Sequence, residues 1–153
     1  PYAGLFKIVE PDGKTKEVVM HRKGATRAFG PNRKETPKIY KETGQPVIVG
    51  GSMETGSFLC VGTDHAELET FGSTMHGSGR TMSRSAAIRQ FKGKQLYDDM
   101  LKRGIYVKSV SWEGLAEEAG LAYKDINEVV ETMEIANVSK KVCRLIPVGN
   151  VKG

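Results

Sequence analysis

The segment with the clearest chemical potential is a histidine set among glycines, serines and arginines. It runs from Ser73 to Arg84 and reads STMHGSGRTMSR. The glycines after His76 allow the backbone to approach a ligand closely. A neutral imidazole nitrogen can attack a phosphate and form a phosphoramidate. The segment is therefore a candidate for nucleotide transfer, and a glycine turn with one surface histidine is the simpler alternative, which the local pattern taken alone favours.

Arginines and a helix start follow this histidine. Thr81 or Ser83 can cap a helix that continues through Ile88. The first turn of such a helix offers N–H groups to a phosphate. Arg80 and Arg84 are four residues apart, so a helix that includes both would present them on one side as an anion clamp.

A second candidate is the glycine-rich segment GGSMETGS over residues 50–57. It follows a short predicted strand and is rich in hydroxyl groups, as phosphate-binding and ribose-binding loops often are. It matches neither the Walker A motif nor the dinucleotide fingerprint. The alternative is an ordinary glycine-rich hairpin loop.

A third candidate is the basic segment HRKGATR over residues 21–27, at the end of a predicted strand. Its cations suit contacts with phosphate groups, and a solvated charged loop is the commoner outcome for such a run. The tail, Val151 to Gly153, ends with a penultimate lysine and by itself predicts a frayed terminus.

The elements that must position these segments are strands and helices in mixed order. Alternating and apolar runs predict strands over 5–10, 15–20, 46–49, 58–62, 105–110 and 142–148, with a turn at 11–13. Helical spacing predicts helices over 94–103, 113–119 and 125–135. Residues 21–45 form a long predicted loop and 63–69 a polar surface connection. This mixture, without strict alternation, predicts an α+β fold.

Composition narrows the classes further. The chain has 153 residues, the length of one domain, and a net charge of +5. This charge leans towards an anionic partner, and a domain with a mildly basic face is the alternative, which charge alone does not outweigh. No run approaches the ~18 apolar residues of a membrane span, and the first residues lack a signal-peptide core. Cys60 and Cys143 lie in apolar runs and are predicted to be buried thiols in a reducing compartment. No CxxC, HExxH or EF-hand pattern is present, so no closed metal site is expected.

Taken together and in order, these segments resemble the C-terminal part of the RtcB family, the GTP-dependent RNA-splicing ligases. The resemblance covers the chain from about Lys14 onward. Its matching segments are residues 21–29, 46–48, 51–53, 71–73, 76–80, 82–84, 116–119, 122–125 and 151–153. An ordered set of this kind is far more specific than any single motif.

The resemblance implies a fold and an activity. The fold would be α+β, with mixed and antiparallel sheets and flanking helices, and the chain would be the C-terminal portion of a larger ligase domain. His76 would attack GTP and carry GMP as a phosphoramidate. The GMP would then activate an RNA 3′-phosphate, often derived from a 2′,3′-cyclic phosphate, for attack by a 5′-hydroxyl, as in tRNA splicing or RNA repair.

The resemblance also assigns residues. Contacts with GMP or GTP are expected from Gly50, Gly51, Ser52, Met53, Ser57, His76, Gly77, Ser78, Gly79, Tyr123 and Lys152. Contacts with RNA or the triphosphate are expected from Lys23, Arg27, Arg80 and Arg84. Two positions depart from the family: Gly51 stands where proline is common, and Glu54, where glycine is common, brings a negative charge to a nucleotide loop.

The remaining implications concern cofactors and partners. The family uses Mn²⁺, whose ligands are expected in an N-terminal part, so no metal ligand is expected in this chain and the chain alone is expected to be inactive. The expected partners are RNA (tRNA halves or broken RNA), GTP, that N-terminal part and the helper protein archease, in the cytoplasm or, in a eukaryote, the nucleus. The alternatives are a non-catalytic module that binds guanine nucleotide or RNA, and an assembly fragment.

Overall fold

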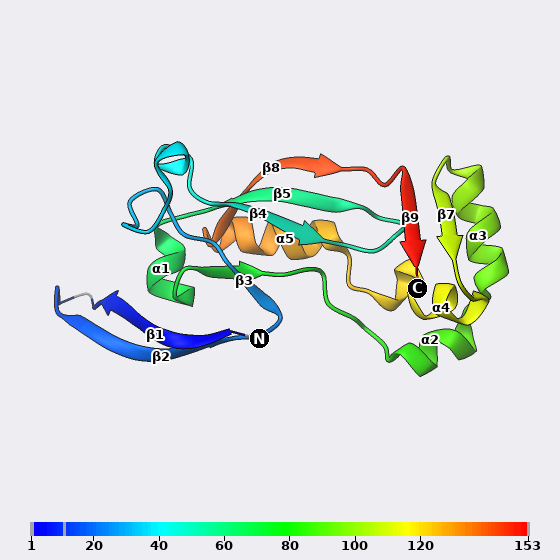
Figure 1. The fold of residues 1–153 in the computed structure, drawn as a ribbon, viewed down its shortest axis with the longest axis horizontal. Coiled ribbons are helices and arrows are strands. Elements are labelled where there is room, and N and C mark those ends of the chain that lie inside the picture. Colours follow the sequence, from blue (N-terminus) through cyan, green and yellow to red (C-terminus); the bar gives the residue numbers. More distant parts are fainter. Residues whose placement is uncertain (1, 11, 153) are drawn as a thin grey trace. The chain divides into compact units, whose positions relative to one another are not determined.

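The computed structural model describes residues 2–10 and 12–152. Helices and small sheets alternate irregularly along the chain, which confirms the predicted α+β class (Figure 1). Two positions of the sequence predictions, Pro11 in the first turn and Gly153 in the tail, lie outside the described residues. The chain divides into two units. The first contains Pro1–Val49, Phe58–Gly77 and Val130–Cys143, and the second contains Gly50–Ser57, Ser78–Val129 and Arg144–Gly153.

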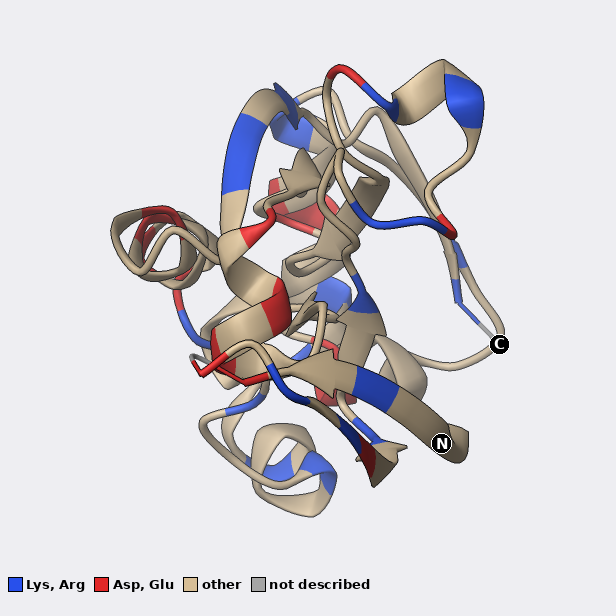
Figure 2. Cartoon of the chain, turned by 90° about the vertical axis from the view of Figure 1, so that its left-hand side faces the viewer, with Lys and Arg blue, Asp and Glu red and all other residues tan. Residues whose placement is uncertain are grey.

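The first unit opens with an antiparallel hairpin of β1 (Tyr2–Val9) and β2 (Thr15–Arg22). Side chains alternate between the two faces of each strand, which places Phe6 and Met20 on the inner side, where they pack with Phe29. Both predicted strands are confirmed. Basic and acidic positions are interspersed along the hairpin and the loop after it (Figure 2).

The basic segment after the hairpin is only partly irregular. It contains β3 (Ala25–Arg27), which pairs antiparallel with β6 (Ser73–Met75), and a 3-10 turn, η1, over Lys38–Tyr40. Between them, the buried hydroxyl of Thr36 donates to the carbonyl oxygen of Gly30 at 2.7 Å. The predicted loop over 21–45 therefore includes a strand, and that strand pairs with the residues just before His76.

A three-stranded sheet has the order β4-β5-β8, with β4 at Pro46–Gly50, β5 at Ser57–Gly62 and β8 at Ser139–Leu145. Every second residue of the central strand β5 is buried, including Cys60. β8 is an edge strand of this sheet, and all its residues after the first are exposed. The prediction that Cys143 is buried is therefore wrong: its side chain lies on this exposed edge strand.

The connection predicted over 63–69 is largely helical. Helix α1 spans His65–Thr70 and ends at Phe71, whose φ of 53° is left-handed. The Oγ1 of Thr63 accepts the N–H of Ala66 at 3.2 Å and so holds the first turn. Six residues with mostly charged or polar side chains form too short a pattern to predict a helix from spacing.

The second unit contains helices α2 (Arg84–Gln90), α3 (Gly93–Lys102) and α4 (Trp112–Glu117). The hydroxyl oxygens of Ser83 and Ser111 each accept a backbone N–H in the first turn of α2 and α4. These are the cap residues that helix starts favour. The predicted helices are confirmed, with Ser83 and not Thr81 as the cap of α2.

A core and a terminal strand complete the second unit. Strand β7 (Tyr106–Ser109) pairs in parallel with β9 (Gly149–Lys152), so the tail is an ordered strand through Lys152 and not a frayed end. A 3-10 turn, η2, covers Gly120–Ala122, and α5 (Ile126–Ile135) continues from this unit into the first. Residues of α3, α4 and β7 pack with Met53 and Ile105 in the core of this unit. The core cluster contains Met53, Met100, Ile105, Val107 and Leu115. Within residues 2–10 and 12–152, no helix is both long and apolar enough to cross a membrane.

Candidate functional site

His76 follows β6 directly in the first unit. Its backbone N–H donates to the carbonyl oxygen of Gly24 at 3.4 Å, which ties the end of β6 to the turn between β2 and β3. Gly24 has a φ of 67°, a conformation that glycine adopts at no steric cost. The residue His76 is exposed, and its ring has no hydrogen-bond partner among the described residues. The ring is therefore free to meet a ligand.

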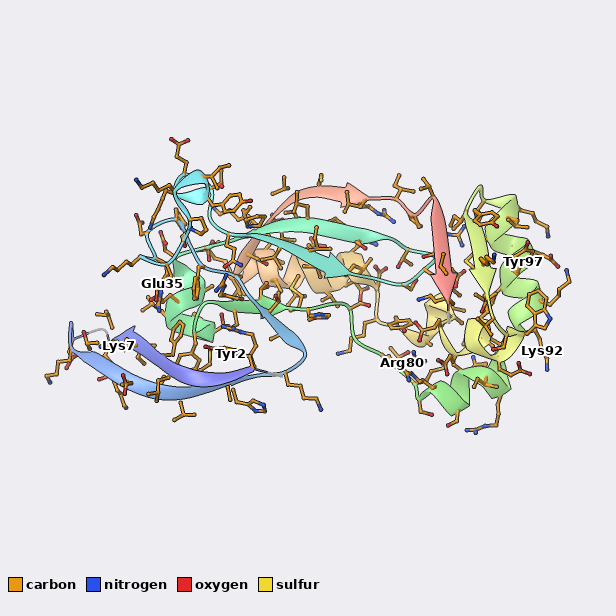
Figure 3. All side chains as sticks on the ribbon, in the orientation of Figure 1. Tyr2, Lys7, Glu35, Arg80, Lys92 and Tyr97 are labelled. Carbon is orange, nitrogen blue, oxygen red and sulfur yellow. The ribbon has the colours of Figure 1, made fainter. Side chains whose placement is uncertain are left out.

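His76 lines a pocket of about 790 Å³ within the first unit. The hairpin, the turn before β3, β3 itself and the loop after β3 supply the other walls. Tyr2, Lys7 and Glu35 of this lining are labelled in Figure 3. Basic side chains outnumber acidic ones around it. The cations are Lys7, Arg22, Lys23, Arg27 and Arg33, and the acids are Glu17 and Glu35.

Arg33 adds no free charge to this pocket. Its guanidinium pairs with Glu35 at 2.8 Å and with Glu67. Burial lowers the pKa of Arg33, but the two carboxylates outweigh that effect and leave the pKa raised. The same group lies 4.2 Å from the centre of the Phe6 ring. Arg33 thus fastens the loop to the hairpin and to α1.

Arg22, by contrast, has only neutral partners. Its Nε donates to Oγ of Ser73 at 2.9 Å, and its guanidinium lies 5.6 Å from the centre of the Tyr2 ring. Burial lowers the pKa of Arg22, and the nearby charge of Arg27 acts in the same direction. Arg22 belongs to the basic segment over 21–27, but the sequence pattern did not predict it as a site residue. The available signal was its position two residues after Met20, on the inner side of β2.

Lys23 and Arg27, both predicted to contact phosphate, do line the pocket of His76. The Nε of Arg27 donates to Oε1 of Gln45 at 3.1 Å, and its guanidinium lies 5.0 Å from the centre of the Phe29 ring. Neither Lys23 nor Arg27 has a carboxylate partner within the described part of the chain. With Arg22, they give the pocket three cations without a paired anion, which suits a phosphate-bearing ligand.

The glycine-rich segment of the second unit is a closed loop. The N–H of Gly51 donates to the carbonyl oxygen of Gly56 at 2.9 Å. The Oγ of Ser52 accepts the N–H groups of Glu54 and Thr55, each at 3.2 Å, and Oγ1 of Thr55 accepts the N–H of Ser52 at 3.0 Å. The hydroxyl groups therefore shape the loop itself.

Other predicted nucleotide residues of this loop have different surroundings. Met53 is buried in the core, and its carbonyl oxygen accepts a hydrogen bond from Nδ2 of Asn150 at 3.0 Å. Ser57 is half-buried at the start of β5. At Gly50, an added Cβ would meet no atom within 4 Å. Met53 thus anchors the loop by packing, and open space remains beside Gly50.

Ser78 is the most unusual polar residue of the second unit. Its backbone N–H donates to the carbonyl oxygen of Gly50 at 2.8 Å, while its Oγ is buried and has no hydrogen-bond partner in the described structure. An unpaired buried hydroxyl costs about 1–3 kcal/mol, so it calls for an explanation such as a ligand contact. The next residue, Gly79, is exposed with a φ of 73°. Gly77, which precedes Ser78, is half-buried and is the last residue of the first unit before the chain enters the second.

Tyr123 and Lys152, both predicted nucleotide contacts, meet at Glu118. The Tyr123 hydroxyl donates to Oε2 of Glu118 at 2.8 Å, and Nζ of Lys152 lies 3.4 Å from the same oxygen. The Nη1 of Arg80 donates to the Tyr123 hydroxyl at 2.9 Å and to Oε1 of Glu118 at 3.4 Å. Sequence reasoning did not single out Glu118, because only the fold reveals that three separate segments converge on it.

The charges of this cluster are mutually compensated. Burial raises the pKa of Glu118, but the Tyr123 hydrogen bond and the positive charges of Lys152 and Arg80 outweigh it and leave the pKa lowered. Burial and the Glu118 carboxylate raise the pKa of Tyr123. Near neutral pH the cluster therefore holds an ionised Glu118 and a protonated Tyr123.

The predicted clamp of Arg80 and Arg84 is wrong. Helix α2 begins at Arg84, because Ser83 is an extended cap residue, so Arg80 lies before the helix. The Nη2 of Arg80 donates to the carbonyl oxygen of Glu117 at 2.6 Å. The Arg84 side chain is 70% exposed, with its Nε 4.0 Å from Oε1 of Glu117. The two arginines therefore do not act from one helix face.

Glu54, the family departure that brings a charge to the loop, is neutralised within the second unit. Its Oε2 accepts the N–H of Gly120 at 2.5 Å, and its Oε1 lies 3.3 Å from Nη1 of Arg103. Arg103 also donates to the carbonyl oxygen of Glu54 at 2.7 Å. This carboxylate thus serves the packing of the loop.

The described residues do not fit a manganese site. Over the described ranges, no three His, Cys, Asp or Glu side chains are grouped so that they could hold a metal ion. His21 is exposed on β2, and His65 lies on α1 with its Nε2 3.9 Å from Glu69.

Comparison with known proteins matches this chain to one family. The family model described as tRNA-splicing ligase RtcB matches residues 6–153. The chain is 51% identical to tRNA-splicing ligase RtcB of Pyrococcus furiosus over 98% of its own length and 16% of that protein. It is 51% identical to the protein of that name from Archaeoglobus fulgidus, over 97% of its own length and 31% of the relative. The chain thus spans less than a third of these relatives, and it belongs to the RtcB family.

Proposed function

We propose that this chain is the histidine-bearing part of a GTP-dependent RNA ligase. That ligase would join RNA 3′-phosphate or 2′,3′-cyclic phosphate ends to 5′-hydroxyl ends. The relatives named tRNA-splicing ligase support the reaction class. The observation that carries the proposal is the free ring of His76 in a pocket lined by Arg22, Lys23 and Arg27.

In the first step, an unprotonated ring nitrogen of His76 attacks the α-phosphorus of GTP. A P–N bond forms, the bond to pyrophosphate breaks, and the ring loses its N–H proton to water or buffer. Negative charge grows on the phosphate oxygens and on the leaving pyrophosphate. Arg22, Lys23 and Arg27 stabilise that charge, because they bring positive charge without a bound carboxylate.

In the next steps, an oxygen of the RNA 3′-phosphate attacks the GMP phosphorus and displaces His76, whose ring takes back a proton from water or buffer. A 2′,3′-cyclic phosphate end would first take up water to give this 3′-phosphate. The RNA end then carries GMP through a phosphoanhydride. The 5′-hydroxyl of the second strand attacks the RNA phosphorus, a phosphodiester forms, and GMP leaves. The same cations would stabilise both of these steps, since each attack increases the negative charge on phosphoryl oxygens.

We assign guanine-nucleotide contacts to the second unit as part of this proposal. The support is the unpaired buried hydroxyl of Ser78, which lies two residues after His76 in the chain, and the Tyr123–Lys152 cluster at Glu118. Lys152 and Tyr123 can donate hydrogen bonds to acceptor atoms of a base. The Mn²⁺ implied by the family resemblance would need ligands from residues outside this chain, and no step is assigned to it.

The test is covalent labelling with GTP carrying ³²P in its α-phosphate. The chain is incubated with Mn²⁺ and the remaining part of a full-length family member, then denatured. The expected result is label on this chain that His76→Ala abolishes and the matched variant His65→Ala leaves. A label that survives His76→Ala would overturn the proposal.

A second candidate function is a binding module for RNA or guanine nucleotide without catalysis. The net charge of +5 supports it, because a basic surface attracts an anionic ligand whether or not a reaction follows. It predicts binding that weakens with salt but ignores His76→Ala and metal. The labelling experiment separates the two candidates, because a pure binder acquires no covalent GMP.

A further inference from the structure

Two adjoining hollows in the second unit surround Trp112. One, of about 580 Å³, lies among α3, β7 and the start of α4. The other, of about 260 Å³, lies among α2, α3 and α4. Trp112 and Lys94 line both hollows, and we call the surface around the two hollows the aromatic groove.

The aromatic groove exposes flat rings to solvent. Tyr106 is 61% exposed and Trp112 is 49% exposed. Tyr97 packs edge-on against Trp112, with ring centres 5.7 Å apart and an interplanar angle of 76°. This contact fixes the indole and leaves ring surface on which another flat group can stack.

The rim of the groove is basic. Lys92 and Lys108 are exposed and have no carboxylate partner within the described part of the chain, and Figure 3 labels Lys92 and Tyr97. Lys94 lies 6.0 Å from the centre of the Tyr97 ring and pairs with Asp98 at 2.9 Å. Glu113 is the acid among the lining residues. Stacking surfaces beside unpaired lysines are the combination that single-stranded nucleic acid requires.

We propose that the aromatic groove binds single-stranded RNA, with bases stacked on Trp112 and Tyr106 and phosphates contacted by Lys92 and Lys108. This inference rests on the proposed function, which supplies RNA as substrate. It adds an RNA contact that uses none of the residues assigned to nucleotide transfer. Lysines without partners favour a polyanion over an apolar peptide as the occupant.

The chain contains its own reporter, since Trp112 is its single tryptophan. We would titrate the 153-residue chain with a single-stranded oligouridylate and follow tryptophan fluorescence. Stacking is expected to quench the emission. Tyr106→Leu should weaken binding at least about fivefold, the loss expected for one stacked base. Lys108→Glu should weaken binding and lower the slope of log affinity against log salt by about one.

The matched control is Lys102→Glu, the same charge change on α3 at a residue that lines neither hollow. It should leave the titration unchanged. A folding check by circular dichroism accompanies every variant. Should the chain alone fail to melt cooperatively, the same substitutions are compared in a full-length family member by anisotropy of labelled oligouridylate.

Absence of RNA binding, equal weakening by Lys102→Glu, or quenching by an acidic peptide but not by RNA would overturn the inference. Guanylylation of His76 is measured on the same variants and should be unchanged by Lys108→Glu. If guanylylation fails while the groove binds RNA, the proposed function falls and the groove assignment remains. If His76 is guanylylated while the groove does not bind RNA, the groove assignment falls and the proposed function remains.

Discussion

Arg22 donates a hydrogen bond from its Nε to Oγ of Ser73 over 2.9 Å. The bond joins β2 of the hairpin to β6, the strand that ends just before His76. Because Ser73 is buried and neutral, it orients the guanidinium without removing its charge. The hairpin is therefore part of the candidate site, and its cation reaches the pocket of His76 in a fixed orientation.

The positive charge of Arg27 should attract any phosphate-bearing ligand of this pocket. Arg27→Gln is expected to weaken RNA binding and to reduce the slope of log affinity against log salt by about one, because one phosphate contact is lost. The measurement is RNA affinity at several salt concentrations. Lys38→Gln, at an exposed lysine of η1 outside the pocket, is the matched control. Equal slopes for the two variants would contradict the assignment of Arg27.

Glu118 should make the free energy of unfolding depend on pH. The pKa of this carboxyl is lowered in the folded protein from its ordinary value of 4.5. Its stabilising effect is therefore complete above about pH 4.5 and is lost as the pH falls through the lower folded pKa. At pH 7, Glu118→Gln should reduce the free energy of unfolding by about 1–3 kcal/mol, since Arg80 and Lys152 lose the half-buried anion between them.

Denaturant unfolding at pH 7 and at a series of lower pH values checks this prediction. The difference between the protein and Glu118→Gln should shrink on acidification. Glu113→Gln, at an exposed residue, should leave stability unchanged. A difference that stays constant down to pH 2 would show that the ionised carboxylate is not the stabilising group.

The loop over 50–57 offers a matched pair of glycines. Gly56 has a φ of 91°, and a Cβ there would lie 2.2 Å from the carbonyl oxygen of Leu145. Gly56→Ala should therefore destabilise the protein by at least about 1–3 kcal/mol through backbone strain and steric conflict. Gly50→Ala meets open space and should change stability by no more than about 0.5 kcal/mol. Thermal unfolding of both variants measures the difference in stability. An equal loss of stability in Gly56→Ala and Gly50→Ala would contradict this loop geometry.

The two thiols should differ in reactivity. Burial raises the pKa of Cys60 to about 11, with the Glu134 charge adding to the effect, whereas Cys143 is exposed. At pH 8 the native protein should react with a thiol reagent at Cys143 alone, and both thiols should react after denaturation. Rapid reaction of native Cys143→Ser with the reagent would contradict the burial of Cys60.

Sequence alone predicts the features that depend on local pattern. Alternation gives the hairpin of β1 and β2, and helical spacing gives α3 and α5, because each element carries its own periodicity. His76, Lys23 and Arg27 were also predicted, and the structure places all three at one pocket. Their grouping follows from the pairing of β3 with β6.

Features that depend on distant pairing were not predictable in this way. Strand β9 is ordered by its parallel pairing with β7, and no local pattern in four residues reveals that partner. Arg80 is oriented by Glu118 and Tyr123, which lie 38 and 43 residues further along the chain. Such contacts arise only once the second unit has folded, so spacing in the sequence misassigned Arg80 to a helical clamp.

The most direct test of the central claim is an intact-mass measurement after incubation with GTP and Mn²⁺. It is made on this chain with the remaining part of a full-length family member, beside His76→Ala. The expected result is an acid-labile adduct of the mass of GMP that peptide mapping places on His76 and that the variant lacks. An adduct that persists in His76→Ala, or a folded and complete protein that gains none, would contradict it.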